Sequence, residues 1–191
     1  MKRIGSLCLC CCAAAVAFTG CAKPQMDPSA MKPPERPKEL DQLEPWVGSW
    51  ATEGEMTMAE GNTMKMTGTA DIAWDCDRNV LVEHMEGASD SMKDMKMLGL
   101  AIYSWNAKKK KFYSYYFNNM PMSAEGNLTY NEATKTWKMT GEGYNPMVGQ
   151  NTHWVGTITM PDNNTMNWKW TTRDAWKLRK LEEGTGTARR K

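Results

Sequence analysis

The chain has 191 residues, with 24 lysine and arginine residues against 22 acidic ones and a formal net charge of +2. Residues 1–20 contain Lys2 and Arg3 and no acidic residue, so the rest of the chain carries 22 basic and 22 acidic residues. A neutral chain without a clustered positive surface argues against a nucleic-acid partner.

The N-terminus resembles a bacterial lipoprotein signal peptide. A positive start is followed by an apolar run over residues 4–18, which is too short to span a bilayer comfortably. The run ends in residues 18–21 (FTGC), which resemble a lipobox. We therefore expect residues 1–20 to be a signal peptide and Cys21 to carry lipid. The alternative is an ordinary signal peptide that is cleaved elsewhere.

Lipid on Cys21 would make the bilayer a partner of the chain and place it in the bacterial cell envelope. Several acyl chains give stable attachment, whereas a single chain binds only reversibly. Ala22 follows where an aspartate would favour the inner membrane, by analogy with enterobacterial sorting. The expected location is thus the outer membrane, facing the periplasm.

Cysteine content excludes a disulfide framework. Four cysteines lie in the expected signal peptide and Cys21 is expected to carry lipid, which leaves Cys76 alone. One cysteine can form neither an intrachain disulfide nor a cysteine metal cluster. Asp75 and Asp77 flank Cys76, and negative neighbours disfavour a thiolate. We expect Cys76 to be an ordinary half-buried side chain.

A proline-rich tether over residues 21–39 precedes the expected domain at residues 40–191. A short helix is predicted at residues 37–46, because Leu40, Leu43 and Trp46 are spaced three apart. The length of the remaining chain suits one domain with a sizeable core.

The rest of the chain predicts antiparallel strands. Met166, Trp168 and Trp170 alternate with polar residues, which is the pattern of a half-buried strand. Turn residues separate such segments at short intervals. The expected strands are residues 50–58, 64–74, 80–86, 98–105, 111–118, 123–130, 136–143, 153–160, 165–172 and one near the C-terminus. An all-β, up-and-down barrel of nine or ten strands would hide their edges.

Several segments form a recognisable series along the chain: residues 43–50 (LEPWVGSW), Trp74 with residues 80–83 (VLVE), residues 98–106 (LGLAIYSWN) with 110–113 (KKFY), residues 119–120 and 123–126, and the basic end at residues 189–191. Taken in order, they resemble the DUF1579 family of bacterial proteins of unknown function. The opening is also similar to calycin-like barrels such as the nitrobindins. The resemblance implies a barrel and no particular reaction. This chain has residues 77–79 (DRN) where the family has a Gly-Gly-Arg turn, which leaves the strand register there open.

Methionine is unusually frequent, with 17 residues in the chain. The pairs Met56/Met58 and Met64/Met66 flank a predicted turn, and residues two apart share one face of a strand. Four thioethers on one patch suit Cu(I). Methionine also fills cores and lines adaptable apolar cavities, which is our preferred interpretation. Reversible oxidation of exposed methionines is a third interpretation.

No cofactor is favoured. A histidine ligates haem in nitrobindin-like barrels, and this chain has only His84 and His153. His153 alternates with an apolar face and is expected in solvent, whereas His84 shares a face with valines that suits a buried role better. The common nucleophile, phosphate-binding and zinc motifs do not occur in the sequence. We therefore expect a protein that is not an enzyme.

Tryptophan is the positive indication of binding, because the chain holds nine. So many large rings suit a barrel that encloses an apolar cavity or packs a partner, and equally a densely packed core. The first hypothesis is a barrel that binds a small apolar or amphipathic ligand. Its expected lining residues are Trp50, Trp74, Met166, Trp168 and Trp170. Copper handling by the methionine pairs and a structural envelope module are the alternatives.

Overall fold

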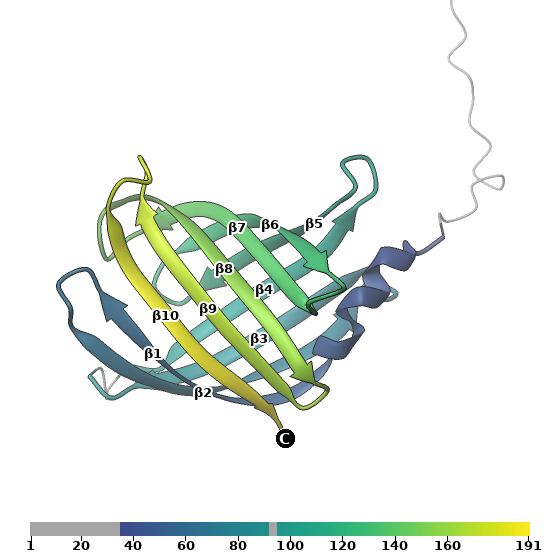
Figure 1. Ribbon diagram of the computed structural model, residues 1–191, viewed down its shortest axis with the longest axis horizontal. Helices are drawn as coiled ribbons and strands as arrows, with labels where there is room; N and C mark the ends of the chain where they lie inside the picture. The colour runs from purple at the N-terminus through teal and green to yellow at the C-terminus, as the bar shows by residue number, and fades with distance from the viewer. Residues whose placement is uncertain (1–34, 92–94) are drawn as a thin grey trace, which may run out of the picture. The chain divides into compact units, whose positions relative to one another are not determined.

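The computed structural model describes residues 35–91 and 95–191. Ten antiparallel strands form a closed barrel in which each strand pairs with its neighbours in the sequence and β10 pairs with β1 (Figure 1). The strands are β1 (Gly48–Met58), β2 (Thr63–Asp75), β3 (Val80–Ser89), β4 (Met97–Asn106), β5 (Lys111–Asn118), β6 (Ser123–Asn131), β7 (Thr136–Asn145), β8 (Gln150–Asp162), β9 (Thr165–Asp174) and β10 (Lys180–Arg190). The predicted all-β, up-and-down barrel is therefore confirmed. The expected signal peptide, Cys21 and most of the tether lie outside the described residues.

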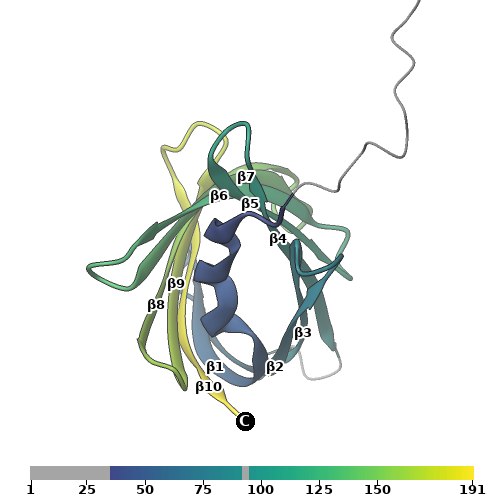
Figure 2. The same ribbon diagram turned by 90° about the vertical axis from the view of Figure 1, so that its right-hand side faces the viewer.

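The predicted N-terminal helix is confirmed as the 3-10 helix η2 (Lys38–Trp46). In a 3-10 helix, side chains three residues apart lie above one another. Leu40, Leu43 and Trp46 thus project from one side, and all three are buried. The helix lies at one end of the barrel (Figure 2). None of the helices among the described residues has the length and apolar character needed to cross a membrane.

Aromatic rings fill the interior next to η2. The ring of Trp46 packs edge-on against Tyr103 at 5.1 Å and against Trp137 at 5.3 Å between centroids. Phe112 and Trp137 form a further edge-on pair. Edge-to-face pairs add to the stability that burial of the rings provides. We call this end of the barrel the closed end.

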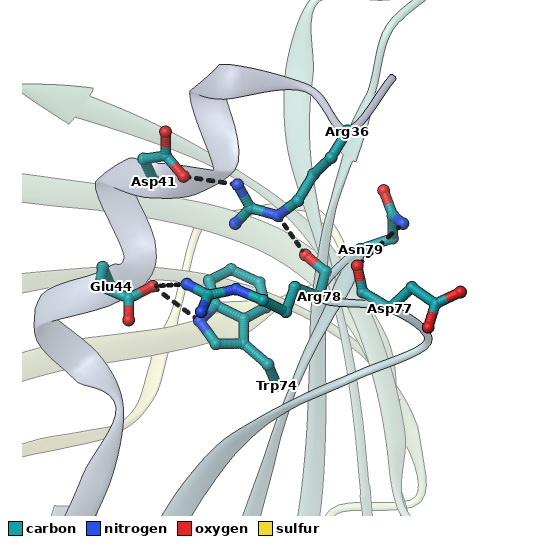
Figure 3. Close-up of polar contacts among 7 residues, drawn as sticks. All are labelled: Arg36, Asp41, Glu44, Trp74, Asp77, Arg78 and Asn79. Atoms are coloured by element: carbon teal, nitrogen blue, oxygen red, sulfur yellow. Dashed lines mark hydrogen bonds and ion pairs between the residues drawn. The ribbon is translucent and has the colours of Figure 1, made fainter. Parts of the chain in front are cut away.

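A polar clasp fastens η2 to the turn between β2 and β3 (Figure 3). Glu44 of η2 accepts hydrogen bonds from Trp74 Nε1 at 2.8 Å and from Arg78 Nη2 at 2.7 Å. Arg36 Nε donates to the Arg78 carbonyl at 2.6 Å. The guanidiniums of Arg36 and Arg78 both lie close to the Trp74 ring, at 4.8 and 5.7 Å from its centroid.

The turn that contains residues 77–79 has no glycine and keeps a regular register, with Asp75 opposite Val80. Its residues Cys76, Asp77 and Arg78 have φ values of 48°, 53° and 64°. This left-handed region is strained for residues other than glycine. Cys76 is exposed in this turn, so the prediction of a half-buried side chain was wrong. A tight turn leaves no neighbouring strand to cover the thiol.

Candidate functional site

Alternate residues of each strand face the interior of the barrel. Next to the closed end, inward side chains such as Trp50, Leu81 and Trp137 are at most 2% exposed. Away from that end the inward face is mixed: Met56, Trp170 and Glu182 keep part of their surface accessible, whereas Thr172 is buried. We call this part the open half of the interior. Part of its lining is therefore accessible to solvent.

Three tryptophans lie flat against the wall of the barrel. A Cβ atom built on Gly54 of β1 would lie 2.6 Å from the ring of Trp168, which belongs to β9 two strands away. The Trp168 indole therefore runs along the wall across β10. Trp170 covers Gly184 of β10 in the same way, at 2.6 Å. Glycine permits this close approach because it has no side chain.

Trp154 of β8 extends in the other direction. Its ring passes over Gly141 of β7, at 2.6 Å from a built Cβ, and reaches Gly126 of β6, at 2.7 Å. The three indoles together cover the inner wall from β6 round to β1. Because they lie along this wall, they do not fill the middle of the barrel with their own bulk. All three remain partly exposed.

A polar group lies on the opposite wall, where β3 to β5 face β8 to β10 across the ring of ten strands. Tyr103 donates a hydrogen bond of 2.7 Å to Glu83 Oε2. Tyr116 flanks Ala101 on the side away from Glu83. Burial raises the pKa of Glu83, and the hydrogen bond from Tyr103 opposes part of this rise. The pKa of Tyr116 is raised by burial and by the charge of Glu83.

A second inward carboxyl, Glu182 of β10, lies nearer the open end. Burial raises its pKa, and the Thr172 hydroxyl partly offsets this. Asp174 stands at the rim, where its carboxylate accepts a hydrogen bond from the Leu178 amide at 2.8 Å. The open half is therefore apolar in its walls and acidic in its few charged groups.

The four methionines of the alternative metal site face inward at the open end. Met56 and Met64 are direct cross-strand partners, and Met58 and Met66 follow them on the same face. Met85 and Met97 line the adjacent strands β3 and β4. Six thioethers thus share one wall. Among the described residues, no group of three or more histidine, cysteine or acidic side chains is arranged to hold a metal ion.

The five lining residues expected from the sequence lie in different parts of the molecule. Trp168 and Trp170 lie on the wall of the open half, as described above. Trp50 and Met166 belong to the buried core, at 0% and 7% exposure. Trp74 is part of the clasp with η2. The structure thus brings two of the five together in the open half.

Both histidines lie on the outer face of the barrel. His84 is exposed, so the expectation that its face suits a buried role was wrong. The apolar inner face of β3 instead carries Leu81, Glu83 and Met85. Sequence reasoning missed Glu83, although a lone acidic residue between two apolar ones at a spacing of two was a visible signal. Trp154 and the glycines beneath the indoles were also missed.

Two grooves lie on the outside of the barrel. One, of about 390 Å³, is bordered by the exposed rings of Tyr115, Phe117 and Tyr144 and by Glu125 and Glu142. The other, of about 340 Å³, lies over β2 and β3 beside Met95 and Lys96. Outward side chains form most of both grooves.

Comparisons with known proteins agree with this architecture. The structure of Rv2717c from M. tuberculosis matches with a TM-score of 0.61 at 12% identity, covering 82% of this chain and 99% of the other. The S-type phycobiliprotein lyase CPES from Guillardia theta matches with a TM-score of 0.57 at 12% identity, covering 82% of this chain and 94% of the lyase. At such identities the likeness concerns the fold alone. Comparison with curated protein sequences finds no match.

A family model described as a protein of unknown function, DUF1579, matches residues 35–176. The matched segment begins just before η2 and ends after β9, so it includes η2, the three tryptophans of the wall and Glu83, but not β10. Because this match covers well over half of the 191 residues, the chain belongs to the DUF1579 family.

Proposed function

We propose that the barrel binds a small apolar or amphipathic molecule in the open half of its interior, without catalysis. The observation that carries the proposal is the set of three indoles laid against glycines. A protein that only needed a packed core would gain more burial by turning these rings inward, since burial of apolar area stabilises the fold. Rings that line a wall and stay partly exposed provide an apolar surface for a ligand.

The lining supports binding of an adaptable kind. Methionine side chains are flexible and polarisable, so a methionine wall fits ligands of differing outline. The indole wall opposite supplies a flat and rigid surface. The phycobiliprotein lyase has a similar fold at 12% identity. This likeness concerns the fold and does not indicate that the two proteins share a reaction.

Fluorescence titration of the purified domain with N-phenyl-1-naphthylamine, a neutral apolar probe, tests the proposal. We expect saturable binding that weakens at least tenfold in Trp170→Ala, which removes one indole from the wall. Trp176→Ala is the matched control, because Trp176 lies in the turn between β9 and β10 and is 81% exposed. Circular dichroism establishes that both variants fold. Absence of saturable binding, or equal loss in both variants, contradicts the proposal.

Copper handling is a second candidate, favoured by the direct pairing of Met56 with Met64. Soft thioethers are suitable ligands for Cu(I). Competition with a chromogenic Cu(I) chelator would detect a site that the double variant Met56→Leu/Met64→Leu loses. Leucine keeps the side-chain volume, and Met147→Leu is the control because Met147 is 51% exposed in a turn. If stoichiometric Cu(I) binding tighter than about micromolar is absent, this candidate is removed. A micromolar Kd corresponds to about 8 kcal/mol of binding free energy.

We also propose that the barrel works attached to lipid through Cys21, which lies outside the described residues. The sequence of residues 18–21 supports this, together with the proline-rich segment that follows. Replacing Cys21 by serine should prevent acylation, so that the protein leaves the membrane fraction or stays uncleaved. A cleaved Cys21→Ser protein that still sediments with membranes would count against the anchor.

A further inference from the structure

We infer that the molecule bound in the barrel carries a positive charge, as a protonated amine or an amidinium group, and that this group pairs with Glu83. The inference rests on the proposed binding function and adds the chemical class of the ligand. It follows from the charges of the inner face, the contacts of Glu83 and the position of the indoles.

The inner face of the barrel is acidic. Glu83 and Glu182 face the interior, and Asp174 stands at the rim. Lys65, Lys111, Lys138 and Lys169 fall on outward positions of the alternating pattern. Lys180 lies at a bulge in β10, where it is exposed and pairs with Glu183. Arg190 faces inward at the closed end, where its guanidinium already donates to three backbone carbonyls. A ligand that enters the open half therefore meets negative groups that no inward cation neutralises within the described residues.

Glu83 is the deepest of these acidic groups. Its one hydrogen bond among the described residues comes from the Tyr103 hydroxyl, a neutral donor. A carboxylate in an apolar environment is costly unless a cation or several donors compensate it. Burial accordingly raises the pKa of this carboxyl. A cationic group of the ligand would supply the missing partner and form a charge-assisted hydrogen bond.

The surroundings of Glu83 also suit the rest of such a molecule. Tyr103 lies on β4, which is five strands from β9 in either direction round the barrel. The indoles of Trp168 and Trp170 start from β9 and lie over β10 and β1, outside the wall of β3 and β4 that carries Glu83 and Tyr103. Aromatic faces attract cations as well as apolar groups. The geometry therefore suits an organic cation with an apolar body, rather than a fatty acid or another anion.

Three dansyl probes with the same octyl chain test this inference: one ends in an amine, one in a methyl group and one in a carboxylate. At pH 7 we expect the ammonium probe to bind wild-type protein at least tenfold more tightly than the methyl probe, and the carboxylate probe to bind most weakly. Glu83→Gln should remove the preference for the ammonium probe while binding of the methyl probe changes less than twofold. Glu60→Gln, in the exposed turn between β1 and β2, is the matched control.

The outcomes separate the two proposals. Equal binding of the ammonium and methyl probes to wild-type protein, or a preference for the carboxylate probe, overturns the inference and leaves the binding function intact. Failure of all three probes to bind removes both proposals. A preference for the ammonium probe that survives in Glu83→Gln also overturns the inference. The comparison of the three probes on wild-type protein needs no variant. The inference can therefore be contradicted even if Glu83→Gln folds poorly.

Discussion

The guanidinium carbon of Arg190 lies 4.3 Å from the centre of the Trp50 ring and so joins the last strand of the barrel to the first. The same guanidinium donates to the carbonyls of Val47 at 2.6 Å, Pro45 at 2.9 Å and Asn163 at 2.9 Å. One side chain thus connects the end of η2, β1, the turn between β8 and β9, and β10. The contacts of Arg190 therefore stabilise the closed end of the barrel.

Arg190→Ala should destabilise the barrel by at least about 2 kcal/mol, because a cation–π contact contributes about 0.5–2 kcal/mol and even one hydrogen bond from a charged donor about 1.5–3 kcal/mol. Arg190→Lys should rescue little, because an ammonium cannot reproduce the planar fork. Urea unfolding followed by tryptophan fluorescence measures the loss. Arg189→Ala is the control: Arg189 and its partner Glu53 are both largely exposed, and such pairs contribute about 0–1 kcal/mol. Equal losses in the two alanine variants would contradict the role assigned to Arg190.

Glu83 predicts a pH dependence of stability. Burial raises the pKa of Glu83 above its ordinary value of 4.5, so the folded chain holds this proton more tightly than the unfolded chain. The associated stability is fully present below about pH 4.5 and is lost as pH rises through the raised pKa. Glu83→Gln stays neutral, so its free energy of unfolding should rise relative to wild type between pH 4 and pH 8.

Urea unfolding at pH 4, 5, 6, 7 and 8 would measure this difference. Glu60→Gln controls for loss of a carboxyl at the surface and should track wild type across the series. Tyr103→Phe removes the hydrogen bond that lowers the pKa of Glu83, so its loss of stability should grow with pH. Parallel curves for Glu83→Gln and wild type would show that Glu83 has the same pKa in the folded and unfolded chain.

Gly184→Ala should push the Trp170 ring off the wall, because the new Cβ would lie 2.6–2.7 Å from three atoms of the indole. Overpacking of this kind costs about 1–3 kcal/mol, and the displaced ring should weaken probe binding. Gly87→Ala is the matched control inside the same barrel, since its nearest atoms are at 3.2 and 3.7 Å. Thermal unfolding and the naphthylamine titration report the two effects. Unchanged binding in Gly184→Ala would show that the ligand does not touch this indole.

The outer groove contains a pair of like charges. Glu125 and Glu142 lie directly opposite one another on β6 and β7, an arrangement that destabilises a sheet. Glu125→Gln should therefore stabilise the protein by about 0.2–1 kcal/mol at low ionic strength, and added salt should reduce the gain. Glu55→Gln provides the opposite case, because Glu55 lies opposite Lys65. A loss of stability in Glu125→Gln would indicate that repulsion across this pair is negligible.

Strand order and the short helix were predictable because they depend on local patterns. Alternation of apolar and polar residues located the strands, and the spacing of Leu40, Leu43 and Trp46 located η2. Alternation alone does not say which face is inside when both carry apolar residues, as in β3. The valines of that strand lie outside and Glu83 lies inside, which reversed the expectation for His84.

The indole wall depended on contacts that no local pattern reveals. Trp168 lies on Gly54, which is 114 positions away in the sequence, and the two meet only because β10 pairs with β1. Trp74 and Trp50 show the same pattern of a tryptophan in a strand, yet Trp74 contacts η2 and Trp50 lies in the core. The sequence indicates which residues are tryptophan and which strand face they share. Their position round the barrel and their depth in it depend on how the strands close into a ring.

The pairing of β1 with β10 joins the first strand of the domain to the last. Trp50 and Arg190 are 140 positions apart, and contacts between such distant positions slow folding. Until β10 has emerged from the ribosome, β1 and β9 both present unpaired edges, which invite aggregation. Truncation before β10 should then yield an insoluble product rather than a smaller barrel.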